Sequence, residues 1–157
     1  MALNAKRPIW QPESECIDRE ELEQIQLERL EATLARVALH VPFYRRRFDE
    51  IGFDPDGFRS LADLRRLPFT TKDDLRAAHP YGLFAVPLRD VVRVHASSGT
   101  TGRATAVGYT RNDLRTWSDL VARNLAAGGV TKDDVGQTAF DYGPSTGPLG
   151  RHAGTAR

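Results

Sequence analysis

Two short β-branched runs flank a segment of hydroxyl-bearing residues and glycines, and this arrangement constrains the fold more than any other feature of the sequence. Val91, Val92 and Val94 form the first run, and the second covers residues 105–109. Valine and threonine favour strands because their branched side chains fit a pleated surface. The pattern therefore predicts two strands joined by a loop that must hold its shape.

The first 90 residues carry helix signals instead. Asp18 followed by Glu21 resembles a capping box, and apolar residues spaced three and four apart come after it. These apolar residues are Leu27, Leu30, Leu34, Val37 and Val41. The spacing predicts an amphipathic helix, and Pro42 should end or kink it because proline removes an amide donor.

Shorter helices are expected on both sides of the two strands. Residues 43–51 should form one that Gly52 closes, and Ser60 and Thr71 should begin two more. Thr110 with Asp113 should cap a helix that ends near Gly128. A third strand is predicted over residues 135–142, and the glycine- and proline-rich tail after it should be poorly ordered.

These elements predict an α/β protein with three parts. A helical N-terminal segment covers residues 1–90, the start of an α/β domain with a phosphate loop covers residues 91–143, and an irregular tail covers residues 144–157. The sheet is only beginning where the sequence stops, so we expect a truncated fold.

Composition excludes several classes of protein. The net charge of +1 gives no global field that attracts nucleic acid or anionic lipid, and Cys16 is the single cysteine, which excludes an internal disulfide. No apolar run reaches the roughly 18 residues of a membrane span. We expect a cytoplasmic protein that binds neither membrane nor nucleic acid. The arginines at 45–47 are interpreted as the solvated face of a helix, with a phosphate contact as the alternative.

The segment between the two strands carries the chemistry. Four hydroxyls and two glycines occupy six positions and a permanent cation follows: Ser97, Ser98, Gly99, Thr100, Thr101, Gly102 and Arg103. Glycine lets backbone amides approach a ligand, and hydroxyls donate to phosphate oxygens. A flexible linker that binds nothing is the alternative. The position between two strands favours a phosphate site, although the sequence has neither a Walker A loop nor a G-x-G-x-x-G fingerprint.

The string from His95 to Gly102 resembles the phosphate loop of the acyl-adenylate-forming superfamily, and its His-Ala start is similar to the phenylacetate-CoA ligase branch. Further similarity lies at residues 9–10, 41–45, 67–75, 107–110 and 140–143, so most of residues 9–143 is covered. The resemblance implies the adenylate-forming α/β fold. It also implies that residues 97–102 hold the β- and γ-phosphates of ATP, with Arg103 at the mouth of the loop.

In the complete enzyme, the resemblance implies ATP, coenzyme A and Mg²⁺, and an aryl acetate that is activated to an acyl-adenylate and transferred to coenzyme A. Arg103 and Ala104 stand where the family usually has Lys and Pro. Tyr142 is interpreted either as lining the aryl pocket or as a core aromatic, and His95 either as a site residue or as a packed one. His40, His79 and His152 show no metal-ligand spacing.

No catalytic or metal-binding residue of the family can be matched, because these lie beyond residue 157 in relatives. We therefore expect the chain alone to be inactive, and a homodimer of the complete enzyme stays open. A non-catalytic module that binds a nucleotide or a partner is the alternative function. A third interpretation is an unstable product that exposes the apolar stripe of residues 18–41.

Overall fold

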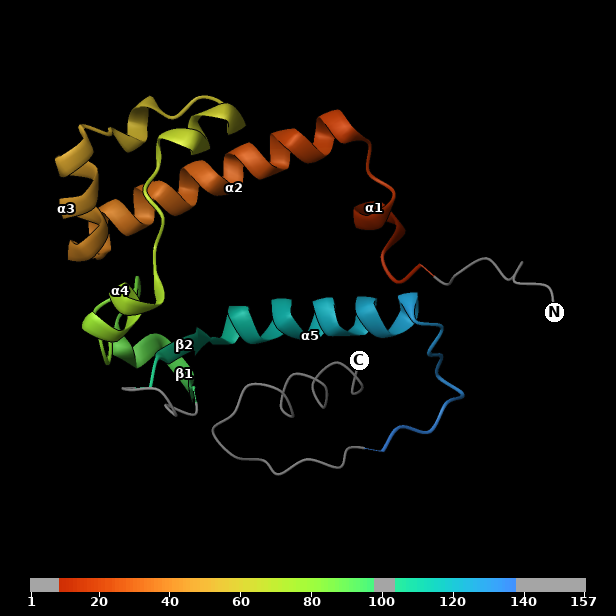
Figure 1. Ribbon diagram of the computed structural model, residues 1–157. Helices are drawn as coiled ribbons and strands as arrows, with labels where there is room; N and C mark the ends of the chain where they lie inside the picture. Colours follow the sequence, from red (N-terminus) through yellow and green to blue (C-terminus); the bar gives the residue numbers. More distant parts are fainter. Residues whose placement is uncertain (1–8, 98–103, 138–157) are drawn as a thin grey trace.

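The computed structural model describes residues 9–97 and 104–137, which form a mixed helical and α/β fold (Figure 1). The helices are α1 (Pro12–Glu15), α2 (Arg19–His40), α3 (Pro42–Ile51), α4 (Lys72–Ala77) and α5 (Arg111–Ala127). Three 3-10 helices are η1 (Pro55–Gly57), η2 (Leu61–Arg66) and η3 (Leu88–Asp90). The strands are β1 (Val91–Ala96) and β2 (Ala106–Thr110).

The elements form two tiers. Figure 1 shows α2 and α3, with the 3-10 turns η1 and η2, in one tier, and α5 with the β1–β2 hairpin in the other. The segment around α4 connects the tiers at one end, and α1 connects them at the other. This arrangement places the hairpin in the tier opposite the long helix.

Local signals in the sequence set the ends of α2 and α3. The Asp18 carboxylate accepts a hydrogen bond from the amide of Glu21 at 2.9 Å and begins α2. Pro42 occupies the first turn of α3, and Gly52 ends it with a left-handed φ of 61°. The predicted helices at residues 19–41 and 43–51 are therefore confirmed.

Arg45 and Arg46 are exposed, which agrees with the solvated face expected for the basic cluster, and Arg45 also makes contacts that the sequence pattern does not predict. Its guanidinium donates to the carbonyl oxygens of Ala38 at 3.1 Å and Leu39 at 2.6 Å. These carbonyls belong to the last turn of α2, where no further helical amide can reach them. Arg45 therefore joins the end of α2 to α3 because a cation is favourable at the negative end of a helix.

Aromatic side chains and Leu34 form the core of the first tier. Phe48 and Phe53 have ring centroids 5.1 Å apart, and Phe53 lies 6.5 Å from Phe58. Phe58 is completely buried. Leu34, which belongs to the apolar stripe of α2, is buried in the same cluster. Leu27, Leu30 and Val37 pack against it. The stripe is thus at least partly covered within the chain, which does not favour the third interpretation of an exposed stripe.

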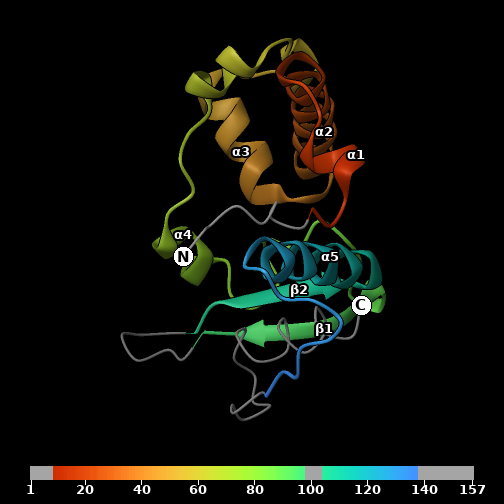
Figure 2. The same ribbon diagram turned by 90° about the vertical axis from the view of Figure 1, so that its right-hand side faces the viewer.

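The two predicted strands form an antiparallel hairpin. Val94 pairs with Gly108 and His95 with Val107. Thr110 is both the last residue of β2 and the N-cap of α5. Its hydroxyl accepts a hydrogen bond from the Asp113 amide, and the Asp113 carboxylate accepts one from the Thr110 amide. Figure 2 shows α5 lying along one face of the hairpin. The immediate strand-to-helix turn fixes this packing.

The third predicted strand is not found over its described part. Residues 135–137 belong to no strand, and Val135 is 99% exposed. A valine that contacts nothing gains no burial from an extended conformation, so its β propensity is not realised here. Residues 138–142 of the predicted strand, and the predicted irregular tail at 144–157, lie outside the described residues.

Candidate functional site

Two hydrogen bonds between Ser97 and Thr105 close the base of the predicted phosphate loop. The Ser97 amide donates to the Thr105 carbonyl at 3.0 Å, and the Thr105 amide donates to the Ser97 hydroxyl oxygen at 2.9 Å. They add one further pair beyond Ala96 and Ala106, where the strand ladder ends. The two ends of the segment 98–103 are therefore held together at a fixed point.

Of the predicted site residues, the structure describes Ser97 alone. Ser98, Gly99, Thr100, Thr101, Gly102, Arg103 and Tyr142 lie outside the described residues. The Ser97 hydroxyl oxygen already accepts a bond from Thr105, and one donor proton and a second lone pair are left. Ser97 thus serves the closure of the loop, a role that the sequence analysis did not assign to it.

His95 lies in an aromatic cluster between the hairpin and α5. Its ring centroid is 5.0 Å from that of Tyr109 and 5.4 Å from that of Trp117, and the imidazole is only 2% exposed. Burial lowers the pKa of His95, and the positive charge of Arg93 lowers it further. The ring is therefore neutral near pH 7. The interpretation of His95 as a packed residue agrees with this geometry.

Neither ring nitrogen of His95 has a hydrogen-bond partner within residues 9–97 and 104–137. A buried polar group without a partner costs about 1–3 kcal/mol. The strand alternation explains why the ring turns inward: His95 shares its face with Tyr109, and α5 covers that face with Trp117. The aromatic stack fixes the strand that leads into the loop.

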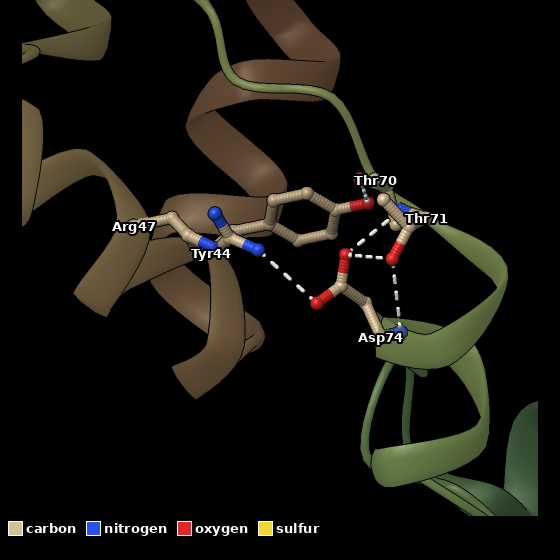
Figure 3. Close-up of polar contacts among 5 residues, drawn as sticks. All are labelled: Tyr44, Arg47, Thr70, Thr71 and Asp74. Carbon is tan, nitrogen blue, oxygen red and sulfur yellow. Dashed lines mark hydrogen bonds and ion pairs between the residues drawn. The ribbon is translucent and has the colours of Figure 1, made fainter.

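A polar junction connects α3 to the start of α4 (Figure 3). The Tyr44 hydroxyl lies 2.9 Å from the Thr70 hydroxyl, and Arg47 donates to Asp74 at 3.1 Å. Asp74 also accepts from the Thr71 amide at 2.8 Å and from its hydroxyl at 2.7 Å. The hydrogen bonds from Thr71 hold the pKa of Asp74 below its usual value, and Arg47 adds to the effect.

The sequence analysis identified Thr71 and Asp74 as a helix cap but missed the ion pair with Arg47. The partners are 27 residues apart, and no periodic pattern relates them. The junction lies where the chain passes from the helical tier to the hairpin tier, so it orients one tier relative to the other.

A second contact connects the tiers at the opposite end of the molecule. The Arg123 guanidinium donates to the Gln11 side-chain oxygen at 2.6 Å and lies 3.5 Å from the Glu15 carboxylate. Gln11 caps α1 and Glu15 ends it, whereas Arg123 lies on α5. The helix that supports the hairpin is therefore held by the first described residues of the chain.

No group of three or more His, Cys, Asp or Glu side chains within residues 9–97 and 104–137 is placed to hold a metal ion. None of the helices in these ranges is long and apolar enough to cross a membrane.

The sequence is similar to phenylacetate-coenzyme A ligases. It is 55% identical over 146 residues to the enzyme of Thermus thermophilus, which covers 93% of this chain and 33% of that protein. It is 53% identical over 139 residues to the enzyme of Escherichia coli, covering 88% of this chain and 32% of that protein. No family model matches the chain.

The fold is similar to that of solved acyl-CoA ligases. A 2-hydroxyisobutyryl-CoA ligase in complex with 2-HIB-AMP and CoA superposes with a TM-score of 0.85 at 34% identity, over 99% of this chain and 34% of that one. An open conformation of the ligase with the same ligands gives a TM-score of 0.84 at 33% identity, over 99% of this chain and 37% of that one.

The sequence similarity and the fold similarity both point to CoA ligases. The relatives are ligases, and the chain spans about a third of the length of the curated relatives it matches. The hairpin, its closing Ser97–Thr105 bonds and the helix behind it all lie in the matched region. The chain is therefore similar over most of its length to phenylacetate-coenzyme A ligases in sequence and to an acyl-CoA ligase in fold, and it spans about a third of each.

Proposed function

We propose that the segment 97–103 is the phosphate loop of a phenylacetate-CoA ligase and that it binds the β- and γ-phosphates of ATP. The closure of its base by Ser97 and Thr105 is the observation that carries the proposal, because donors on a closed loop are positioned before the ligand arrives. The proposed donors are the hydroxyls and amides of Ser98, Gly99, Thr100, Thr101 and Gly102, with Arg103 as the flanking cation.

In the complete protein, the carboxylate of phenylacetate would attack the α-phosphorus of ATP. The bond from that phosphorus to the bridging oxygen of the β-phosphate would break, and pyrophosphate would leave. The thiol of coenzyme A would then displace AMP and give phenylacetyl-CoA. Negative charge grows on the β-phosphate as the bond breaks, and preorganised donors that bind the leaving group more strongly at that point accelerate the step. The role that we assign to this chain is to hold that leaving group.

Other parts of the proposal rest on family resemblance. Tyr142 would line the aryl pocket. The helical segment would cover residues 1–90, the start of the α/β domain residues 91–143, and the tail residues 144–157. The complete protein would work in the cytoplasm, and whether it forms a homodimer stays open. Mg²⁺ would screen the phosphates in the complete enzyme. The described residues do not fit that ion, since no three acidic or imidazole groups among them converge. No step is assigned to it here.

The chain as it stands would bind nucleotide without turning it over. It spans about a third of its relatives, and the acidic metal ligand and catalytic lysine that the family implies have no match in its sequence. Non-catalytic phosphate binding is therefore the activity that we propose for the 157-residue chain itself.

Calorimetry of the 157-residue chain with ATP and with pyrophosphate tests the loop. We expect weak binding of both ligands and its loss in the double variant Thr100→Val/Thr101→Val, which removes two hydroxyl donors at nearly constant volume. Thr116→Val on the exposed side of α5 is the matched control and should bind like the parent. Equal binding by the loop variant and the control would refute the phosphate-loop assignment.

An AMP-forming assay tests the activity of the complete protein. If the reading frame continues past Arg157, its product should form AMP when ATP, phenylacetate and coenzyme A are all present. Pyrophosphate release that needs ATP and the acid but not coenzyme A would separate the first step from the second. No AMP from the complete, folded protein would contradict the ligase assignment even if ATP binds.

A further inference from the structure

A groove lies where α2 ends and α3 begins. Residues 81–87, which lead toward β1, form its other wall. The groove consists of two neighbouring hollows of about 450 and 390 Å³, and both are lined by His40 and Phe84. Cavities of this size accept small organic ligands. Both hollows open to solvent, so a ligand can enter without separating the two tiers.

Two arginines and a histidine line the groove. Arg36 and His40 come from the last turns of α2, and Arg46 comes from α3. Within residues 9–97 and 104–137, the side chains of Arg36 and Arg46 make no ion pair or hydrogen bond. One acidic residue, Asp74, also lines the groove, but Arg47 and Thr71 already occupy its carboxylate. Among the described residues that line the groove, the two arginines therefore have no carboxylate left to balance their charge.

Aromatic rings form the other part of the wall. Phe43, Tyr81 and Phe84 line the second hollow, and the rings of Tyr81 and Phe84 are 5.2 Å apart. Phe84 also lines the first hollow, where the segment 85–87 completes an apolar wall. Flat aromatic faces favour a planar ligand because stacked or tilted ring pairs are more favourable than area burial alone explains.

We propose that this groove binds a planar ring that carries an anionic group. The ring would lie against Phe84 and Tyr81, and the anion would accept hydrogen bonds from Arg36 or Arg46. Arginine suits this role because its fork matches both carboxylate and phosphate oxygens. An aryl carboxylate and a nucleoside monophosphate share this chemistry. The proposal rests on described lining residues outside the segment 97–103, so it does not depend on the proposed phosphate loop.

Phe84 connects the groove to the hairpin. Its ring lies directly against Gly108 of β2, where an added Cβ would come within 2.5 Å of a ring carbon. Gly108 pairs with Val94 in the hairpin, so a ligand that rests on Phe84 contacts a residue that packs against β2. Binding should therefore shift the Gly108 amide signal as well as those of the groove.

Nuclear magnetic resonance titration of the 157-residue chain tests the proposal, with phenylacetate, AMP and inorganic phosphate as separate probes. We expect phenylacetate or AMP to shift the amides of Arg36, His40, Arg46 and Phe84 at millimolar concentrations. Inorganic phosphate should bind about tenfold more weakly because it has no ring. A response to only one ring-bearing probe supports the proposal and identifies the source of the ligand.

Two double variants separate the groove from general charge effects. Arg36→Gln/Arg46→Gln should weaken binding about tenfold, whereas Arg29→Gln/Arg115→Gln removes the same charge from exposed helix positions outside the groove and should stay within about twofold. The loop variant Thr100→Val/Thr101→Val should bind AMP and phenylacetate like the parent.

Three results would overturn the proposal. They are no shift of groove amides with either ring-bearing probe, an affinity for inorganic phosphate equal to that for the ring-bearing probe that binds, and equal weakening by the groove variant and its control. Loss of AMP or phenylacetate binding in the loop variant alone would move the site to the loop and would also overturn it. The amide spectra of the variants report in the same experiment that each is folded.

Discussion

Arg47 Nη2 lies 3.1 Å from Asp74 Oδ1, so α3 is held to the first turn of α4 across 27 residues of sequence. Both side chains are partly shielded, with 34% and 18% of their surface exposed. A pair in this setting is weaker than a fully buried one, but it acts at the single described segment where the chain passes between the tiers (Figure 3).

Replacing Arg47 by Gln should lower the melting temperature by a few degrees, and added salt should reduce the difference between the variant and the parent. Arg46→Gln is the matched control, because Arg46 is exposed and makes no ion pair within the described ranges. The pKa of Asp74, followed by carboxyl resonance, should rise only part of the way to its usual 3.8, since the Thr71 hydrogen bonds are its largest cause. A full return to 3.8 would show that Arg47 dominates instead.

Phe58 and Phe69 form a matched pair for the aromatic core. Phe58 is 0% exposed and Phe69 is 92% exposed. Phe58→Ala should lower the free energy of unfolding by about 3–5 kcal/mol, because it removes a buried ring and leaves a cavity. Phe69→Ala should change it by less than about 0.5 kcal/mol. Urea denaturation measures both, and similar losses in the two variants would contradict the assigned core.

Gly108→Ala should destabilise the hairpin tier. A Cβ at this position would lie 2.5 Å from one ring carbon of Phe84 and 2.7 Å from another, so the ring has to move. Overpacking of this kind costs about 1–3 kcal/mol. Gly136→Ala serves as the control because nothing lies within 4 Å of its added Cβ. Equal melting temperatures of the two variants would show that Phe84 relaxes without cost.

The stability of the chain should depend on pH through His95. Its pKa is lowered from 6.5 on folding, so below pH 6.5 the unfolded chain takes up a proton that the folded chain does not. The contribution of His95 to stability is therefore complete above pH 6.5 and is lost as the pH falls toward its folded pKa. Urea denaturation at a series of pH values should show this fall.

In His95→Phe that part of the pH dependence should vanish. Stability near pH 7 should be equal to or above that of the parent, because the replacement keeps a ring of similar shape and removes two nitrogens without described partners. A marked loss of stability at pH 7 would mean that the imidazole makes hydrogen bonds to residues outside the described ranges.

Sequence patterns predicted the elements whose signals are local. Asp18, Pro42 and Gly52 bound the first two long helices, and Thr110 with Asp113 caps α5, because each signal acts on backbone groups within one turn. The helix predicted after Ser60 forms as the 3-10 helix η2, with the predicted box between Ser60 and Asp63. Capping signals indicate where a helix begins but not which kind of turn follows.

Long-range contacts were beyond the sequence patterns. No periodic pattern indicates the hydrogen bonds from Arg45 to the last carbonyls of α2 or the ion pair between Arg47 and Asp74. Both arginines were predicted to lie on a solvated face. The predicted site is described at Ser97 alone, where the hydroxyl closes the loop. Phosphate binding by residues 98–103 depends on where their amide and hydroxyl donors point, and the spacing of residues in a sequence does not specify those directions.

The contact of Arg123 with Gln11 has a consequence for synthesis on the ribosome. The two residues are 112 positions apart, so at about 5–20 residues per second α1 exists for roughly 6–20 s before its partner is made. The cluster of Leu34, Phe48, Phe53 and Phe58 is complete much earlier in the growing chain. The helical tier should therefore form first, and the hairpin tier should dock when the final turns of α5 emerge and α1 receives its arginine.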